Sequence, residues 1–229
     1  MALKDRRFMV DEEMLELVVG YAGLQPGDAV LEVGAGSGNL TEKIAEKVRV
    51  TAIEKEPDLI PILRRKFDGD DRVTLLQGDA LTVEYPLYNK IVSNLPYSIS
   101  RKLLERLIVE GFELAVLVVQ REFAEKVAAP PSSGNYRMVS ALAQSTCEVE
   151  VLDEIRPQAF KPQPRVSSSV LRLRQRWRPP PDYLGFLRRL FSLKNKKMRN
   201  ILDDVPEGYG QMRPAEMQAE DLICLYQRL

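Results

Sequence analysis

The chain of 229 residues contains no histidine. This absence excludes Ser-His-Asp and Cys-His catalysis and every histidine-ligated metal site. Only two cysteines occur, Cys147 and Cys224, and their wide separation predicts neither a disulfide framework nor a zinc site, which suits a reducing cytoplasm. No apolar run approaches the roughly 18 residues of a membrane span, and the polar opening MALKDRRFMVDEE is unlike a secretory signal. We therefore expect a cytoplasmic protein that uses neither a membrane nor a metal.

Net charge is absent as well, because 33 Lys and Arg balance 33 Asp and Glu. The balance is uneven along the chain. Residues 1–155 hold 18 basic and 26 acidic residues, a charge of −8, whereas residues 156–229 hold 15 and 7, a charge of +8. Within 156–199 only Asp182 is acidic. This asymmetry predicts that one part of an otherwise acidic protein faces a polyanion, with a merely solvated basic face as the alternative.

The chain does contain a regular alternation of apolar runs and amphipathic segments. Runs rich in Val, Ile and Leu predict buried strands at residues 29–34, 49–54, 72–77, 90–94 and 113–120. Apolar residues at helical spacing predict helices at residues 11–24, 37–47, 57–67, 101–110 and 121–128. Such alternation is typical of a parallel sheet covered by helices on both faces. The sequence therefore predicts an α/β fold with a doubly wound, mostly parallel sheet.

The second half of the chain breaks this alternation. Two strand-like segments, 147–155 and 167–174, lack a helix between them, and we expect them to form an antiparallel pair at the sheet edge, giving about seven strands. Three prolines make residues 156–168 an extended loop, and RPPPD predicts a stiff linker before further helical segments. We therefore expect a main domain at 1–178 and a small helical C-terminal domain at 179–229.

A glycine-rich loop, LEVGAGSGNLT, follows the first predicted strand. Gly34, Gly36 and Gly38 let the backbone approach a ligand closely, and the N–H groups of the next helix can bind an anion. A dinucleotide fingerprint would have its third glycine at Asn39, so a cofactor with a single carboxylate is favoured over a pyrophosphate. Tight turns alone explain many such glycines, so the loop needs support from other residues.

Two acidic residues supply that support. Glu54 ends the second predicted strand, about 20 residues after Gly34, where an acid commonly accepts hydrogen bonds from a ribose diol. Asp79 ends the third strand and could accept a hydrogen bond from an adenine amine. Doubly wound sheets bind their ligands at the carboxyl ends of the strands. Each residue alone has an ordinary structural explanation, but together they predict a nucleoside cofactor.

The stretch NLPY at 94–97, directly after the fourth predicted strand, completes a recognisable order of motifs. The chain resembles the S-adenosylmethionine-dependent adenine N6-methyltransferases. More closely, it is similar to the small-subunit ribosomal RNA adenine dimethyltransferases, whose relatives include the erythromycin-resistance methylases. The resemblance extends over nearly the whole chain, through QREFAEKV at 120–127, FKPQPRVSSSVLRL at 160–173 and the segments that begin FSLKNKK and RPAEMQ.

The resemblance implies a Rossmann-like class I methyltransferase domain that binds S-adenosylmethionine. It carries the cofactor-binding role onto residues of the opening segment, the strand ends and the loops that follow them. These residues are Arg6, Phe8, Glu32, Gly34, Ala35, Gly36, Glu54, Lys55, Asp79, Ala80 and Asn94.

The opening segment departs from the family pattern. The family usually begins with Gln-Asn-Phe-Leu or Gln-His-Phe-Leu, whereas this chain has Arg6, Arg7, Phe8 and Met9. The family glutamine helps to hold the cofactor. Arg6 could take its place by pairing with the methionine carboxylate, because arginine binds carboxylates through two parallel hydrogen bonds.

The resemblance also implies a catalytic role for the NLPY turn. Hydrogen bonds from the adenine amine to the Asn94 side chain and the Leu95 carbonyl would return the lone pair to nitrogen and stabilise the developing positive charge. Pro96 fixes the backbone at this point. Tyr97 offers a ring on which a flipped adenine can stack, and Phe160 would supply the second face. No strong base is required, which agrees with the absence of histidine.

The basic C-terminal third predicts contacts with an RNA backbone. Lys161 and Arg165 lie in the loop that carries Phe160, and Arg172 and Arg174 alternate on a strand. The residues assigned to RNA binding are Lys161, Arg165, Arg172, Arg174, Arg188, Arg189, Lys196 and Lys197. The resemblance implies small-subunit ribosomal RNA as the partner, within a pre-ribosomal particle, and we expect a monomer.

Three alternatives stay open on the sequence alone. The first is an erythromycin-resistance-type methylase acting on large-subunit RNA. The second is a DNA adenine methylase, although those enzymes more often carry N-P-P-Y or D-P-P-Y. The third is a non-catalytic assembly or transcription factor that keeps the fold, against which the intact set of motif residues argues.

Overall fold

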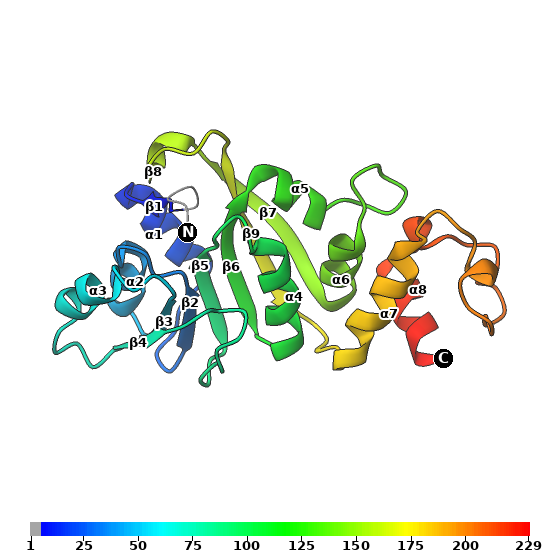
Figure 1. Ribbon diagram of the computed structural model, residues 1–229, viewed down its shortest axis with the longest axis horizontal. Helices are drawn as coiled ribbons and strands as arrows, with labels where there is room; N and C mark the ends of the chain where they lie inside the picture. Colours follow the sequence, from blue (N-terminus) through cyan, green and yellow to red (C-terminus); the bar gives the residue numbers. More distant parts are fainter. Residues whose placement is uncertain (1–5) are drawn as a thin grey trace.

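The computed structural model describes residues 6–229, and a seven-stranded sheet forms the centre of this part of the chain (Figure 1). Its strands are β2 (Ala29–Val33), β3 (Arg49–Glu54), β4 (Val73–Gln77), β5 (Lys90–Asn94), β6 (Leu114–Gln120), β7 (Cys147–Ile155) and β9 (Ser168–Gln175). The order across the sheet is β4-β3-β2-β5-β6-β9-β7. Neighbours from β4 to β6 run parallel, whereas β9 is antiparallel to both β6 and β7. The predicted α/β fold with a mostly parallel, doubly wound sheet is confirmed.

The central strands are mostly apolar because both of their faces are covered. In β6, Ala115, Leu117 and Val119 pack into one core cluster, and the alternate residues Val116 and Val118 pack into a second. All five are fully buried. Successive side chains of a strand point to opposite faces of the sheet, so alternate residues of β6 pack into two separate cores, one on each face.

Eight helices surround this sheet in residues 6–229: α1 (Glu12–Tyr21), α2 (Asn39–Ala45), α3 (Ile60–Lys66), α4 (Ser100–Glu110), α5 (Arg121–Val127), α6 (Met138–Thr146), α7 (Pro181–Ser192) and α8 (Ala219–Gln227). Side chains of α1 and α2 join one core cluster, and those of α4 to α8 join the other. None of these helices is long and apolar enough to cross a membrane.

A second, two-stranded sheet ties the opening segment to the proline-rich loop. It pairs β1 (Phe8–Met9) antiparallel with β8 (Phe160–Lys161), placing Phe8 opposite Lys161 and Met9 opposite Phe160. Figure 1 shows the two strands side by side above α1. Strands of two residues carry no periodic pattern, so the sequence did not predict them.

The predicted antiparallel pair at the sheet edge is confirmed as β7 and β9, but their order is informative. The later strand, β9, lies between β6 and β7, so β7 is the outer strand. The helix α6, which precedes β7, was not predicted. Seven of its nine residues are buried, including Ser140, Ser145 and Thr146, so the helix lacks the polar face that a periodicity argument needs.

The segment after residue 178 is helical, as expected. It begins with α7 directly after the prolines, and it ends with α8 (Figure 1). Tyr183, Leu187 and Leu222 are fully buried in the same core cluster as Leu103 of α4. The segment therefore extends the main core, and the division at 178/179 stays a prediction.

Candidate active site

The carboxyl ends of β2, β3, β4 and β5 meet at one edge of the sheet and border a cavity of about 200 Å³. The strand order reverses between β2 and β5, which is where doubly wound sheets bind ligands. Most of the predicted site residues line this cavity. They are Arg6, Phe8, Gly34, Gly36, Glu54, Lys55, Asp79, Ala80, Asn94, Leu95, Pro96 and Tyr97. Glu32, Ala35 and Phe160 do not line it.

The glycine loop after β2 forms a wall of the cavity in which side chains have no room. Gly36 has a φ of +59°, and a Cβ atom placed on it would lie 2.8 Å from the Phe8 ring. The Gly34 N–H donates to the Ile53 carbonyl at 2.8 Å, which fixes the loop to the end of β3. The loop backbone at Gly36 is therefore packed directly against the Phe8 ring, which only glycine allows at this position.

Glu54, at the end of β3, organises the base of the cavity. Its side chain accepts hydrogen bonds from the backbone N–H groups of Gly36, at 2.8 Å, and of Lys55 and Glu56, at 2.8 and 2.9 Å. A carboxylate has about four acceptor positions, so it can also accept from a ribose hydroxyl. The residue is only 6% exposed, which makes the loss of any of these bonds costly.

Glu32 lies beneath the glycine loop and not in the cavity wall, contrary to the direct cofactor contact that the resemblance implied. It is 1% exposed, and the Thr41 hydroxyl donates to its carboxyl group at 2.5 Å. Burial raises the pKa of Glu32 to about 8, and the Glu54 carboxylate acts in the same direction. Ala35 is likewise buried, with its N–H donated to the Ile53 carbonyl at 3.1 Å.

The replacement Glu32→Gln is expected to change the pH dependence of stability. Between its ordinary pKa of 4.5 and about 8, Glu32 keeps a proton in the folded protein that the unfolded chain releases. The free energy of unfolding of the native protein therefore falls as pH rises through this window, by up to about 1.4 kcal/mol per pH unit, and levels off above it. Glutamine has no such proton. Urea unfolding should show that the free energy of unfolding of the variant, relative to that of the native protein, increases from pH 5 to pH 8. Parallel pH profiles for the two proteins would contradict the raised pKa of Glu32.

Asp79 presents a carboxylate at the opposite side of the cavity, after β4. Lys55 donates to its Oδ2 at 2.7 Å, and the Leu81 N–H donates to its Oδ1 at 2.9 Å. The Lys55 hydrogen bond, followed by the Leu81 N–H, lowers the pKa of Asp79. The side chain is therefore an ionised acceptor, with the geometry expected of a partner for an amine.

Arg6 is already paired within the protein. Its guanidinium bonds Glu56 at 2.8 Å and Asp58 at 2.6 Å, and the hydrogen bonds with these two carboxylates raise its pKa. Two acidic partners compensate its charge, so the structure does not hold Arg6 as a free cation for a ligand carboxylate. Arg7, whose role the sequence did not reveal, also lines the cavity, and its buried Nε has no hydrogen-bond partner in the part of the chain that the structure describes.

Asn94 ends β5 and points its amide into the cavity region. Its Nδ2 donates to the Arg7 backbone carbonyl at 2.9 Å, whereas its Oδ1 is buried and has no hydrogen-bond partner among residues 6–229. Buried polar atoms are normally paired, so an unpaired acceptor at a cavity marks the position of a missing donor. The bond to Arg7 fixes which end of the amide faces that donor.

The rest of the NLPY turn is held from both sides. The Leu95 N–H donates to the Val118 carbonyl at 3.0 Å, and Leu95 is 1% exposed. The Tyr97 hydroxyl bonds the Ser168 hydroxyl at 2.6 Å, which anchors the ring to β9. Phe160, in contrast, is 1% exposed and packs in the core opposite Met9. In this arrangement Phe160 offers no open ring face, because β8 pairs with β1.

The positive charge of Arg172 and Arg174, which were predicted to alternate on a strand and lie on β9, is partly neutralised by the adjacent strand β7. Arg172 donates to Glu150 of β7 at 2.6 Å, and Arg174 stands opposite Glu148 in the register of the two strands. The two glutamates repeat at the same period of two as the arginines. The arginines of β9 and the glutamates of β7 therefore form pairs of opposite charge across the two strands, in addition to the basic surface that was predicted.

The basic residues of the C-terminal segment have mixed surroundings. Arg188 pairs at 2.8 Å with Glu105 of α4, whose side chain is 4% exposed. Arg189 donates to a backbone carbonyl at 3.1 Å, and Lys197 donates to Gln211 at 2.7 Å. The assigned RNA-binding residues that are exposed and outside these contacts are Lys161, Arg165, Arg174 and Lys196.

Comparison with known proteins adds independent information on this architecture. The family model for ribosomal RNA adenine dimethylase matches residues 5–218. The chain is 35% identical over 246 residues to a Methanosarcina mazei protein named "Probable ribosomal RNA small subunit methyltransferase A", covering 96% of this chain and 90% of that one. It is 39% identical over 233 residues to the protein of the same name from Haloarcula marismortui, covering 95% and 80%.

Solved structures give the same result for the fold. A dimethyladenosine transferase from Plasmodium falciparum superposes with a TM-score of 0.84 at 22% identity, covering 96% of both chains. The 23S rRNA methyltransferase ErmE superposes with a TM-score of 0.71 at 27% identity, covering 97% of this chain and 99% of that one. The class I methyltransferase fold is therefore shown. On the family model and the identities of its relatives, the chain belongs to the ribosomal RNA adenine dimethylase family.

Proposed function

We propose that this protein transfers methyl groups from S-adenosylmethionine to the N6 amines of two adjacent adenosines in small-subunit ribosomal RNA, dimethylating both, during ribosome biogenesis. One observation carries the proposal. Within the described part of the chain, the buried Asn94 Oδ1 has no hydrogen-bond partner, and it lies at a cavity bordered by the glycine loop, Glu54 and Asp79. An acceptor with no partner beside a nucleoside-shaped site is what transfer to an amine requires.

The residues present fit the cofactor. The Glu54 carboxylate has acceptor positions for a ribose diol, and the ionised Asp79 can accept from an adenine amine. S-adenosylmethionine, when bound, supplies a sulfonium methyl group. Relatives of the same fold include an RNA methyltransferase from Salinibacter ruber solved with S-adenosyl-L-homocysteine.

The chemistry at the target amine rests on Asn94 and its neighbours. The adenine amine is a poor nucleophile because its lone pair is delocalised into the ring. Donation of an N–H to Asn94 Oδ1 and of the other to the Leu95 carbonyl frees that lone pair and stabilises the positive charge that develops as the N–C bond forms. The methylated ammonium then releases a proton to solvent without a strong base. Tyr97 supplies a ring face for the flipped base.

The RNA is proposed to lie across the basic part of the chain. Relatives at 35–41% identity are named as small subunit methyltransferases, which supports small-subunit RNA as the substrate. Exposed Lys161, Arg165 and Lys196 are suited to phosphate contacts near the site. We also propose that the protein works as a monomer with its RNA-facing helical domain at 179–229.

A second candidate is methylation of large-subunit RNA. The likeness to ErmE, named as a 23S rRNA methyltransferase, extends over almost the entire chain and favours this alternative. The curated relatives favour the small subunit, and their sequences are more similar to this chain than ErmE is.

The test is methyl transfer to purified substrates followed by mass spectrometry of the nucleosides. We expect N6,N6-dimethyladenosine to form on undermethylated small-subunit particles or RNA, and transfer to fall steeply with added salt. Product only on large-subunit RNA would establish the second candidate. Tight binding of S-adenosylhomocysteine without transfer to any RNA would instead indicate a non-catalytic factor.

A further inference from the structure

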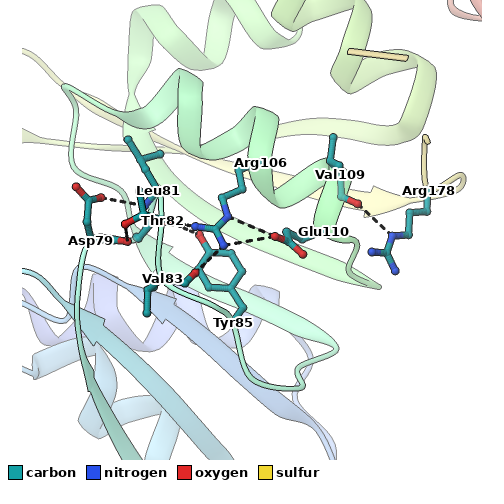
Figure 2. Close-up of polar contacts among 10 residues, drawn as sticks. Asp79, Leu81, Thr82, Val83, Tyr85, Arg106, Val109, Glu110 and Arg178 are labelled. Carbon is teal, nitrogen blue, oxygen red and sulfur yellow. Dashed lines mark hydrogen bonds and ion pairs between the residues drawn. The ribbon is translucent and has the colours of Figure 1, made fainter. Parts of the chain in front are cut away.

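Arg106 of α4 makes an unusual set of contacts with the segment that follows β4 (Figure 2). Its Nη1 donates to the Ala80 carbonyl at 2.8 Å, and its Nη2 donates to the Val83 carbonyl at 2.6 Å. Its guanidinium carbon lies 4.0 Å from the centre of the Tyr85 ring, and the Tyr85 hydroxyl donates to the same Ala80 carbonyl at 2.5 Å. Glu110 accepts a longer bond of 3.4 Å from Nε. The guanidinium is thus held on several sides.

The segment that Arg106 holds carries the Asp79 carboxylate. The Asp79 carbonyl accepts the N–H groups of Thr82 and Val83, both at 2.9 Å, and its Oδ1 accepts the Leu81 N–H. These bonds fold the segment into a compact turn. From the β3 side, the Gly78 N–H donates to the Glu54 carbonyl at 2.9 Å and Lys55 donates to Asp79 Oδ2 at 2.7 Å. Figure 2 shows Arg106 reaching from α4 to carbonyls of this turn. Arg106 therefore holds the backbone that follows Asp79 from the side of α4.

The same helix is joined at its other end to the NLPY turn. The Pro96 carbonyl accepts the Ile99 N–H at 3.2 Å and the Ser100 hydroxyl at 3.0 Å, and α4 begins at Ser100. A helix is a stiff spacer, so a side chain on its second turn stands at a fixed distance from the turn at its start. Arg106 accordingly links the Asp79 segment to the turn that carries Asn94.

We propose that Arg106 is a positioning residue that fixes the Asp79 carboxylate for recognition of the adenine amine of the cofactor. The inference rests on the proposed function, because Asp79 has this partner only if an adenine nucleoside occupies the cavity. Arg106 does not line the cavity and touches no ligand. It acts through the Ala80 and Val83 carbonyls.

Two ligands that differ at one position of the purine report on this role. S-adenosylhomocysteine has an amine at C6, which can donate to Asp79, whereas S-inosylhomocysteine has a carbonyl oxygen there, which faces the carboxylate unfavourably. The ratio of their dissociation constants measures how well Asp79 is placed. A general loss of stability would weaken both ligands together and leave the ratio unchanged.

The experiment titrates both ligands into the full chain by calorimetry, in the native protein and in Arg106→Gln. We expect Arg106→Gln to lower the affinity for S-adenosylhomocysteine by about tenfold and the affinity for S-inosylhomocysteine by less than about twofold. Arg106→Lys, which keeps the charge but reaches one carbonyl, should lie between. Arg101→Ala is the matched control, because Arg101 is on the same helix and, among residues 6–229, forms its one ion pair with Glu105. The control should bind both ligands as the native protein does.

Each outcome decides a different point. An unchanged preference for adenine in both Arg106 variants overturns the positioning role, and so does an equal loss for the two ligands. If Arg106→Gln does not fold, Arg106→Lys and Tyr85→Phe, which removes the second donor to Ala80, give the same readout. Failure of the native protein to bind S-adenosylhomocysteine overturns the proposed function itself.

Discussion

Asn94→Ala is expected to lower the turnover of methyl transfer by about 10² to 10³-fold while leaving the affinity for S-adenosylhomocysteine within about threefold. The side-chain oxygen is buried and unpaired in the structure of residues 6–229, so we expect its acceptor capacity to be used when an amine arrives. An interaction made at the reacting nitrogen contributes to the rate, whereas we propose that cofactor binding depends mainly on Glu54, Asp79 and the glycine loop. Single-turnover rates with saturating cofactor, measured beside a binding titration, separate the two effects.

Asn89→Ala provides a matched control. Asn89 lies immediately before β5, at the opposite end of the strand from Asn94, and its amide bonds the Ala29 N–H and Asp28 at 2.9 and 2.8 Å. Its removal should lower the free energy of unfolding without changing the rate per folded molecule. Near-normal turnover of Asn94→Ala would refute the catalytic assignment.

Glu54→Gln is expected to lower the affinity for S-adenosylhomocysteine by about 100-fold or more. Three backbone N–H groups already point at the carboxylate, so an amide in its place sets an NH₂ donor against at least one of them. The Gly36 N–H would lose its acceptor and the loop would shift. The variant loses the ribose acceptor as well, and its free energy of unfolding should fall by about 2 kcal/mol, because an unpaired buried donor keeps its desolvation penalty.

Calorimetric titration and urea unfolding of the same preparations test this expectation. Glu46→Gln is the control of equal chemistry, because Glu46 is exposed at the end of α2 and lies 3.8 Å from Lys43. It should match the native protein in both measurements. Cofactor affinity of Glu54→Gln within a few-fold of the native value would show that the ribose is held elsewhere.

The central strands were predictable because β2, β5 and β6 are largely apolar runs buried on both faces. Residues 49–54 and 90–94 coincide with β3 and β5, and the other central strands differ by one residue at an end. The elements that escaped prediction lack such a signal. The helix α6 is buried nearly all round, and β1 and β8 have two residues each and are held by a partner about 150 residues away.

The site followed from the sequence where topology alone brings residues together. The ends of parallel strands converge, so Gly34, Glu54, Asp79 and Asn94 were expected to meet, and all four line the cavity. The partners of charged side chains could not be predicted in this way. Nothing in the order of residues indicates that Arg6 is paired with two carboxylates.

Burial of the remaining predicted residues was equally hidden. Glu32 lies under the glycine loop and Phe160 lies in the core, because other elements of the fold cover them. The spacing of residues in the sequence does not show which elements will pack over a given side chain. The anchoring of Asn94 by the Arg7 carbonyl and the Arg106 contacts escaped for another reason. They use backbone acceptors, which carry no residue identity.

The insertion of β9 between β6 and β7 has a consequence for biosynthesis. Until residues 168–175 have left the ribosome, β6 has no neighbour on that side, and β7 has no strand in the sheet to pair with. β6 is apolar from Leu114 to Val119, so a nascent chain of this length presents an unpaired apolar edge. The sheet can close only after most of the protein has been synthesised, which makes this stage of translation the one most exposed to aggregation.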